Sequence, residues 1–509
     1  MKILQKLTGM IICILLCNNV FAQPKVEITL HPEQAQTTIS KHIYGHFAEH
    51  LGSCIYGGLW VGENSPIPNT NGYRNDVLAA LKELQIPNLR WPGGCFADEY
   101  HWMDGIGNPG KRPKMVNNNW GGTVEDNSFG THEFLNLCEL LGCEPYLSGN
   151  VGSGSVEEMA KWVEYITSEG DSPMANLRRQ NGRQQAWKVK FFGVGNESWG
   201  CGGSMTPEYY SDLYRRYSTY CRDYDGNKLF KIASGASDYD YNWTEVLMKN
   251  VGQKMQGISL HYYTVKGWDG SKGSATRFSP DEYYWTLGKS LEIEEVIQKH
   301  IAIMDQYDKG KQIGLMVDEW GTWWDVEPGT NPGFLFQQNT LRDAMVAALS
   351  LNVFHKYADR IQMTNIAQVV NVLQSMILTK DDQMLLTPTY FVFKMYKVHQ
   401  DALYIPLELS IPLVSASASQ KEGKIHLSLV NADLEKEQNI TIHLSDLKTN
   451  QVTGQILTAK TVNDHNTFEH PNEIKITDFK GAKINKSELS VKLPAKSIIV
   501  LEISEYLPN

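Results

Sequence analysis

Two glutamates give the clearest chemical signal in the sequence. Glu197 ends an apolar run that begins at Lys188, and Glu319 ends another that begins at Ile313. Both runs are rich in β-branched and aromatic residues, and tryptophan and glycine follow each glutamate closely. In a barrel of alternating strands and helices, catalytic side chains stand at the C-terminal ends of strands. A glycosidase needs two carboxyl groups, one to protonate the leaving oxygen and one to attack the sugar. Either glutamate alone could be a salt-bridged strand end, but the pair favours catalysis.

Further polar residues accompany the predicted strand ends. Asn196 directly precedes the first glutamate, where its amide can bind a substrate hydroxyl or simply cap the strand. Glu49 follows the first predicted strand and is interpreted as an acceptor for a hydroxyl group. His261 and Tyr263 end the sixth predicted strand. They either orient Glu319 or form a satisfied buried pair, and the sequence alone favours neither interpretation.

The segment from His46 to His50 has the spacing H-x-x-E-H of a zinc protease. That motif binds zinc only on a helix, where the two histidines share a face. Gly45 precedes the segment and Gly52 follows it, so it is interpreted as a strand and a loop. The eight cysteines show no C-x-x-C spacing either. No metal site is therefore predicted.

Cys95 follows Pro92-Gly-Gly, where two glycines allow the backbone to approach a ligand. It is interpreted as a thiol in the sugar pocket, which thiol-blocking reagents should reach. The alternative is a buried, inert thiol. Cys201, close to Glu197, is a second thiol that such reagents could modify. The sequence does not show which cysteines are paired.

Residues 90–107 form a long loop rich in glycine and aromatic residues, and such loops carry function on a rigid scaffold. Tryptophans recur near the predicted strand ends, and their faces suit the C–H face of a sugar. We expect about half of them to be core residues. The tryptophans in question are Trp91, Trp102, Trp120, Trp199, Trp320, Trp323 and Trp324.

Strands and helices alternate from about residue 40 to residue 400, which indicates a parallel sheet with crossover helices. Eight strands are predicted, the number that a closed (β/α)8 TIM barrel requires. Helices are predicted between them, among them residues 73–84, 293–307 and 338–357. The predicted strands are residues 42–46, 88–91, 144–147, 190–195, 230–234, 257–261, 314–318 and 360–365.

After residue 395 glycine and tryptophan become rare, and short alternating runs such as residues 424–430 and 497–503 appear. This pattern predicts a C-terminal antiparallel β-sandwich domain. Residues 23–40 also contain an alternating run and are expected to add a strand to that sandwich. The predicted division is therefore a catalytic α/β barrel over residues 41–398 and a sandwich over residues 399–509.

Charge and the N-terminus set further bounds. The formal net charge is −10, and no basic cluster occurs, so nucleic acid is not an expected partner. Lys2, Lys6 and the apolar run of residues 10–17 resemble a signal peptide over residues 1–22. We therefore expect export to the periplasm or the medium. That run is too short to span a bilayer, and no later segment is expected to do so.

With these motifs assembled, the chain resembles glycoside hydrolase family 51, the α-L-arabinofuranosidases. The resemblance covers nearly all of the sequence after residue 22. It rests on four segments, which are Gly195-Asn-Glu197, Asp318-Glu319-Trp320, Arg90-Trp-Pro-Gly-Gly94 with Asp104-Gly-Ile-Gly107, and Asn365-Ile-Ala-Gln-Val-Val-Asn371.

The resemblance implies roles for individual residues. Glu197 would be the acid/base and Glu319 the nucleophile of a retaining, exo-acting enzyme. The pocket for a terminal arabinofuranose would be lined by Glu49, Cys95, Asn196, Tyr263 and Gln368, with Asn150 and Trp120 in matching stretches and His261 beside them. The substrate would be an arabinose-containing polysaccharide or oligosaccharide. No cofactor would be needed, and a homo-oligomer, a hexamer by resemblance, would form.

Two other functions stay open at this point. An endo-acting xylanase or glucanase could use the same scaffold, because a fold does not fix the substrate. A closed pocket would favour exo cleavage, and an open groove would favour endo cleavage. A non-catalytic polysaccharide-binding protein is the second alternative, but loss of either glutamate would be expected of it, and both are present.

Overall fold

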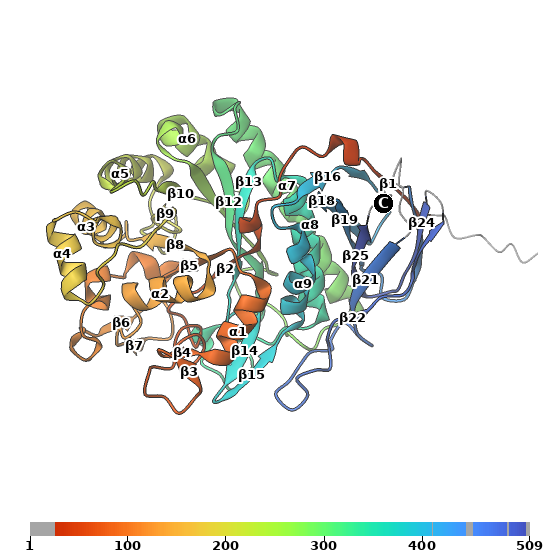
Figure 1. Cartoon of the computed structure of the whole chain (residues 1–509), viewed down its shortest axis with the longest axis horizontal. Coiled ribbons are helices and arrows are strands. Elements are labelled where there is room, and N and C mark those ends of the chain that lie inside the picture. Colours follow the sequence, from red (N-terminus) through yellow and green to blue (C-terminus); the bar gives the residue numbers. More distant parts are fainter. Residues whose placement is uncertain (1–25, 410, 444–450, 486–487, 505–509) are drawn as a thin grey trace, which may run out of the picture.

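The computed structural model describes residues 26–409, 411–443, 451–485 and 488–504. Its larger part is a closed barrel of eight parallel strands, which confirms the predicted fold class (Figure 1). The strands follow one another around the barrel in chain order, as successive β/α units do. They are β2 (Gly45–Phe47), β5 (Asn88–Trp91), β8 (Glu144–Gly149), β9 (Phe191–Val194), β10 (Phe230–Ser237), β11 (Gly257–Thr264), β12 (Gly314–Thr322) and β13 (Ile361–Ala367).

Each barrel strand overlaps a predicted strand, and three of them differ in a way that affects the site. Residues 42–44 belong to a 3-10 turn, since the side chain of Ser40 accepts a hydrogen bond from the backbone of His42. Strands β11 and β12 both run further than predicted. His261 and Glu319 therefore lie within these strands and are direct partners across them, just after a shift in the strand register.

Helices surround the barrel, with additional short ones in the loops. Helix α7 begins much earlier than predicted, because Ser279 and Glu282 form a capping box at its start. The α-helices are α1 (Asn75–Leu84), α2 (Thr131–Leu141), α3 (Val156–Thr167), α4 (Pro173–Gln180), α5 (Pro207–Tyr220), α6 (Tyr241–Val251), α7 (Pro280–Tyr307), α8 (Leu341–Lys356) and α9 (Pro388–Tyr396). None of the helices in the described ranges is long and apolar enough to cross a membrane.

Loop hairpins add three short strand pairs to the barrel. Among them, β14 and β15 follow the last barrel strand and project from its carboxyl end (Figure 1). The pairs are β3 (Asn69–Thr70) with β4 (Tyr73–Arg74), β6 (Met115–Asn117) with β7 (Thr123–Glu125), and β14 (Ile377–Lys380) with β15 (Gln383–Leu386).

The C-terminal part is a sandwich of two sheets, as predicted. One sheet has the order β16-β18-β19-β25-β21-β22, and the other has the order β17-β1-β20-β24-β23. The strands are β1 (Val26–Leu30), β16 (Leu403–Ile405), β17 (Leu407–Glu408), β18 (Val414–Lys421), β19 (Lys424–Asn431), β20 (Gln438–His443), β21 (Gln451–Thr458), β22 (Thr477–Asp478), β23 (Ala482–Asn485), β24 (Glu488–Leu493) and β25 (Ser497–Ser504).

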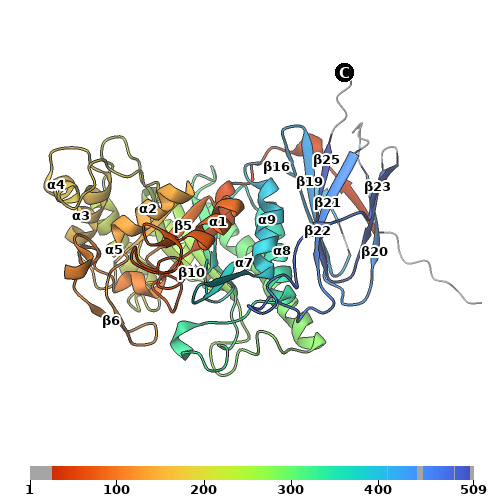
Figure 2. The same ribbon diagram turned by 60° about the horizontal axis from the view of Figure 1, so that its bottom comes forward.

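Strand β1 lies inside the second sheet, parallel to β20 and antiparallel to β17. Helices α8 and α9 stand between the barrel and the sandwich and pack against both (Figure 2). This position explains why nearly every residue of α8 is buried, since a helix that is covered on all sides carries no solvent-exposed face. The domain limits given above stay predictions.

Candidate active site

A cavity of about 300 Å³ opens at the carboxyl end of the barrel strands. This volume is at the lower limit of the ~300–1,000 Å³ that is usual for small-molecule sites. Seven of the ten predicted site residues line the cavity, and the other three, Asn196, His261 and Asn150, do not. The seven are Glu49, Cys95, Trp120, Glu197, Tyr263, Glu319 and Gln368.

Glu319 is fixed by contacts from two other barrel strands. Arg90 on β5 donates to its Oε1 at 2.8 Å, and the hydroxyl of Tyr263 on β11 donates to its Oε2 at 2.9 Å. Nδ1 of His261 lies 3.5 Å from the same Oε2. Burial and the nearby carboxylates raise the pKa of Tyr263 well above its usual value, so that its hydroxyl stays a donor. The carboxylate of Glu319 is thereby held in one orientation.

Arg90 connects strand β12 with the loop after β9, a role that the sequence did not indicate. Its guanidinium donates to the side-chain oxygen of Asn196 and to the backbone oxygen of Asp318. Burial disfavours its charge, but Asp318 and Glu319 outweigh burial and raise the pKa of Arg90 above its usual value. An arginine within a barrel strand is a signal for this role, because a buried cation must have carboxylates beside it.

Glu197 lies on the loop after β9, in the left-handed region of the backbone with φ of 38°. Nδ1 of His261 lies 2.8 Å from its Oε1, and Nε2 of the same ring lies 3.1 Å from Asp318. Burial tends to lower the pKa of His261, but Glu319, Asp318 and Glu197 outweigh it and raise this pKa to about 10. The ring is therefore an imidazolium that bridges strand β12 and the loop after β9.

The pKa of Glu197 is raised, first by burial and then by the negative charge of Glu319. Hydrogen bonding to His261 acts in the opposite direction without cancelling these effects. One oxygen of Glu197, one oxygen of Glu319 and one nitrogen of His261 all lie within 4.8 Å of one another. At this distance the negative charge of Glu319 disfavours ionisation of Glu197, because two negative charges repel.

Glu49 is a buried residue that lines the cavity. It accepts hydrogen bonds from the backbone of Phe96, from Trp120 at 2.9 Å and from Gln368 at 2.9 Å. Burial, together with the charge of Glu319, raises the pKa of Glu49 to about 7 despite these bonds. With a pKa of about 7, the carboxyl group of Glu49 can accept a hydrogen bond from a sugar hydroxyl when it is ionised and can donate one when it is protonated.

Cys95 and Cys201 form a disulfide in the structure. The expectation of a reactive free thiol at Cys95 is therefore corrected. The sequence could not show the pair, because its members are 106 residues apart and lie on loops after different strands. Their sulfur atoms lie 3.8 Å and 3.3 Å from Oε2 of Glu197. The remaining cysteines in the described ranges, Cys54, Cys138, Cys143 and Cys221, are free and buried.

Asn150 does not line the cavity, although it was predicted to do so. Its side-chain oxygen accepts from the backbone of Ser153 and Gly154, and its amide nitrogen donates to the backbone of Tyr100. The residue thus stabilises the loop after β8. Asp98, which the sequence analysis did not single out, joins this loop to the catalytic one through the backbone nitrogens of Val151, Gly152 and Asn196.

Aromatic rings form the rim of the cavity. The rings of Trp268 and Trp323 lie 5.3 Å apart at right angles, and Tyr263 contacts the edge of Trp323 at 5.1 Å. Trp199 lies beside them, with its indole nitrogen donating to Gly235. Trp268 was not among the predicted tryptophans. It stands alone in a glycine-rich loop, so no periodic pattern marks it.

The potential metal ligands in the described part of the chain form two groups at this site. The first consists of Cys95, Glu197 and Cys201, but its two sulfur atoms are bonded to each other. The second consists of Glu197, His261 and Glu319, and a protonated histidine offers no lone pair to a metal. His46 and His50 belong to neither group.

The fold and the paired carboxyl groups at the ends of its strands define a glycoside hydrolase. Residues 80–276 match the alpha-L-arabinofuranosidase 1 domain, and residues 318–497 match the alpha-L-arabinofuranosidase C-terminal domain. A protein of Bacteroides ovatus named intracellular exo-alpha-L-arabinofuranosidase is 69% identical, and the match covers 95% of this chain and 96% of that protein. The chain belongs to glycoside hydrolase family 51, the α-L-arabinofuranosidases.

Solved structures agree with this assignment. The GH51 arabinofuranosidase from Xanthomonas axonopodis pv. citri is 50% identical with a TM-score of 0.93, over 94% of this chain and 100% of that chain. The arabinose complex of the Thermotoga maritima enzyme is 32% identical with a TM-score of 0.83, over 94% of this chain and 99% of that one.

The comparison also corrects one prediction. Export by a signal peptide was expected, but the relative from Bacteroides ovatus is named an intracellular enzyme at 69% identity. Residues 1–22, on which the expectation rested, lie outside the described residues. A charged start and a short apolar run are too weak a pattern to outweigh a relative of nearly full length.

Proposed function

We propose that this arabinofuranosidase removes terminal α-L-arabinofuranosyl residues with retention of configuration, with Glu319 as the nucleophile and Glu197 as the acid/base. The single observation that carries the assignment is the approach of the two carboxyl groups to within 4.8 Å. Retaining glycosidases have carboxyl groups ~5–5.5 Å apart, whereas inverting enzymes leave room for a water molecule at ~6.5–9.5 Å.

In the first step, Glu319 attacks the anomeric carbon while Glu197 gives its proton to the departing glycosidic oxygen. The raised pKa of Glu197 supports this role, because the carboxyl group must be protonated before the bond breaks. Arg90 and Tyr263 hold Glu319 by one oxygen each. Both groups keep the carboxylate aligned for attack and are not consumed in the reaction.

In the second step, a water molecule replaces the leaving group and attacks the glycosyl–enzyme ester. Formation of the ester removes the negative charge of Glu319, which was one of the causes that raised the pKa of Glu197. The pKa of Glu197 then falls, so that it can act as the base that takes a proton from water. Loss of the proton from His261 is not needed at any stage.

Four polar groups are proposed to hold the sugar. Glu49 and Trp120 line the cavity and are already hydrogen-bonded to each other. Among the described residues, Nδ2 of Asn196 and Oε1 of Gln368 are buried without a hydrogen-bond partner. A buried donor or acceptor without a partner costs free energy, which a sugar hydroxyl at each position would recover.

Exo action is supported by the size of the site, because the cavity is small, at about 300 Å³. The enzyme should therefore release arabinose from an aryl α-L-arabinofuranoside and leave an aryl β-xyloside nearly untouched. Proton NMR of the first-formed sugar should show the α-anomer. Cleavage of the xyloside at a comparable rate would favour the endo-acting alternative, and an initial β-anomer would exclude the retaining mechanism.

The natural substrates proposed are polysaccharides or oligosaccharides that carry arabinofuranose at non-reducing ends. The non-catalytic alternative is disfavoured, since both carboxyl groups are present and mutually aligned. The homo-oligomer implied by resemblance to the family, a hexamer, stays a prediction that sedimentation analysis can check.

A further inference from the structure

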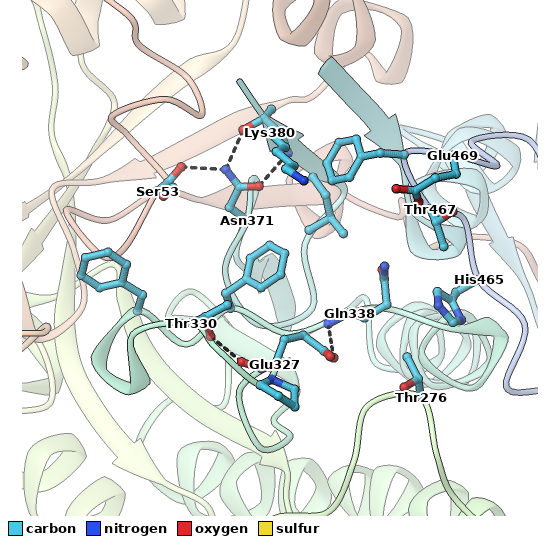
Figure 3. A pocket seen from close by; sticks show the side chains of 16 residues that line it. Ser53, Thr276, Glu327, Thr330, Gln338, Asn371, Lys380, His465, Thr467 and Glu469 are labelled. Carbon is cyan, nitrogen blue, oxygen red and sulfur yellow. Dashed lines mark hydrogen bonds between the residues drawn. The ribbon is translucent and has the colours of Figure 1, made fainter. Parts of the chain in front are cut away.

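A second cleft of about 550 Å³ lies where the C-terminal domain reaches back to the carboxyl end of the barrel (Figure 3). Loops of the barrel contribute most of its lining, and residues 465–469, between β21 and β22, contribute the rest. The principal side chains are Ser53, Thr276, Glu327, Phe334, Phe336, Gln338, Asn371, Lys380, His465, Thr467 and Phe468.

The second cleft adjoins the active-site cavity. Three loops contribute a leucine to the active site and a neighbouring residue to the second cleft. The residues on the two sides are Leu51 and Ser53, Leu335 and Phe334, and Leu373 and Asn371. The backbone of Leu373 donates to that of Leu335 at 3.0 Å, and Asn371 donates to the backbone of Ser53 at 2.9 Å. A wall only one or two residues thick therefore separates the cavities.

Three phenylalanines face the cleft without belonging to the hydrophobic core. Phe334, Phe336 and Phe468 are each half-buried and line the cleft. None of them is part of the hydrophobic clusters formed by the described residues. Half-exposed aromatic rings around one hollow are a feature of ligand sites, where apolar faces meet a few polar groups.

The polar groups in the cleft suit hydroxyl groups. Nδ1 of His465 donates to the backbone oxygen of Asn463 at 2.9 Å, which leaves Nε2 as an acceptor in the neutral ring. One oxygen of Glu327 accepts from the backbone of Gln338. Figure 3 shows Gln338, His465 and Thr467 on one side of the cleft and Ser53 and Asn371 on the opposite side. The amides of Asn371 and Gln338 are already hydrogen-bonded within the protein, to Ser53 and Thr379 and to Asn466 and Asn339. Nε2 of His465 and the hydroxyl of Ser53 are therefore the groups that a ligand would meet first on the two sides.

The cleft is built from fixed parts. Asn463 donates to the backbone of Thr276 at 3.0 Å, and Asn466 donates to the backbone of Leu386 at 2.9 Å. The backbone of Leu341 donates to that of Asp464 at 3.1 Å. These bonds attach the loop of the C-terminal domain to the barrel on both sides of the cleft. A ligand would meet a formed site and would lose little free energy in ordering it.

We propose that this second cleft binds the neutral glycan chain from which the arabinofuranosyl residue branches. The proposal rests on the proposed function, since it assigns the part of the substrate that the active-site cavity does not hold. Two carboxylates and one lysine among the lining residues give no concentrated positive charge for an anion. Phenylalanine rings and uncharged donors and acceptors match the C–H faces and hydroxyl groups of sugars.

The test compares two substrates on the same variants. Phe336→Ala and Phe468→Ala each remove a ring that lies outside the core, and Tyr307→Ala removes an exposed tyrosine at the end of α7 as the matched control. We expect kcat/KM on an arabinofuranosyl-substituted xylo-oligosaccharide to fall on the order of tenfold in the two phenylalanine variants, which corresponds to ~1.4 kcal/mol. Activity on an aryl α-L-arabinofuranoside should not change.

The outcomes separate the proposal from its alternatives. Retained activity on the aryl substrate shows that a variant is folded, and His465→Ala provides a further variant outside the core. An unchanged ratio between the two substrates in all three variants overturns the proposal. A changed oligomeric state in sedimentation, with that ratio unchanged, would identify the cleft as a contact with a second copy and also overturns it. Failure of the unaltered enzyme on the aryl substrate would instead refute the proposed function.

Discussion

The two catalytic carboxyl groups stand in different surroundings, although they are close together. Glu319 lies within strand β12, with 6% of its side chain exposed, and is bound by Arg90 and Tyr263. Glu197 lies on a loop, with 17% of its side chain exposed, and has a single histidine as its hydrogen-bonding side chain and a disulfide against its outer oxygen. One group is held in a strand, and the other is held in a loop.

This difference matches the two tasks. A nucleophile must keep its distance and angle to the anomeric carbon. A position within a strand, with both carboxylate oxygens hydrogen-bonded, suits this task. An acid/base must give up a proton, receive another and admit water, so partial exposure serves it. Removal of Glu319 from its strand should therefore abolish turnover. Changes to Glu197 and to the groups around it should have effects that depend on the leaving group, on pH and on redox conditions.

The largest effect is expected for Glu319→Ala. Without the nucleophile no glycosyl–enzyme ester forms, so turnover should fall by more than about 10⁴-fold. Azide should fill the space of the lost carboxylate and restore part of the activity. NMR of the product should show an arabinosyl azide of inverted configuration, and an azide adduct of retained configuration would assign the nucleophile elsewhere.

Glu197→Ala should give a smaller effect that varies with the substrate. General acid catalysis contributes ~10²–10⁴-fold when the departing oxygen is basic and little when it is not. A series of aryl arabinofuranosides should therefore lose more activity as the pKa of the released phenol rises. Equal losses along the series would contradict the assignment. Glu208→Ala, on α5, is the control and should behave like the unaltered enzyme.

His261→Gln should move the pH profile. The imidazolium lowers the pKa of Glu197, so its loss should raise that pKa further. Because catalysis needs protonated Glu197, activity disappears as the pH rises through this pKa. The alkaline limb of kcat/KM should therefore move to higher pH, by about one unit, which is a usual effect of a neighbouring opposite charge. If the alkaline limb stays in place or moves to lower pH, a group other than Glu197 is responsible for it.

The smallest effect is expected for the disulfide. Reduction, or Cys201→Ser, should lower kcat by about 2- to 10-fold, since small misplacements of a reacting group cost up to ~10²-fold. Iodoacetamide alone should have no effect, because the four remaining described cysteines are buried. After reduction it should inactivate the enzyme by placing bulk against Glu197. The double variant Cys95→Ser, Cys201→Ser should resist it, and inactivation of that variant would point to a different thiol.

The sequence predicted the parts of this site that local patterns determine. Strand-like runs located Glu197 and Glu319, because a strand end is visible from its own residues. The antiparallel sandwich was visible for the same reason, as apolar and polar residues alternate along its strands. The resemblance to the family supplied the pocket residue Gln368, to which no local pattern gave a role.

What the sequence could not show depends on contacts between distant segments. The bond between Cys95 and Cys201 joins two loops, and no spacing rule relates its members. The side-chain amide of Asn150 is hydrogen-bonded to the backbone of nearby loop residues, although its position after a strand resembles that of a ligand-binding residue. Arg90 was noticed only as part of a motif, because its role depends on Asp318 and Asn196, which the barrel brings to it.

The place of strand β1 has a consequence for how the polypeptide is made. Val26 pairs with Ile440 in the same sheet, so the first described strand leaves the ribosome long before its partner does. Almost the whole chain must be synthesised before that sheet can close, and such non-local pairing forms slowly. A fragment that ends after the barrel would keep β1 without β20, and one that begins at the barrel would leave β20 without β1. Neither fragment therefore contains all the strands of this sheet.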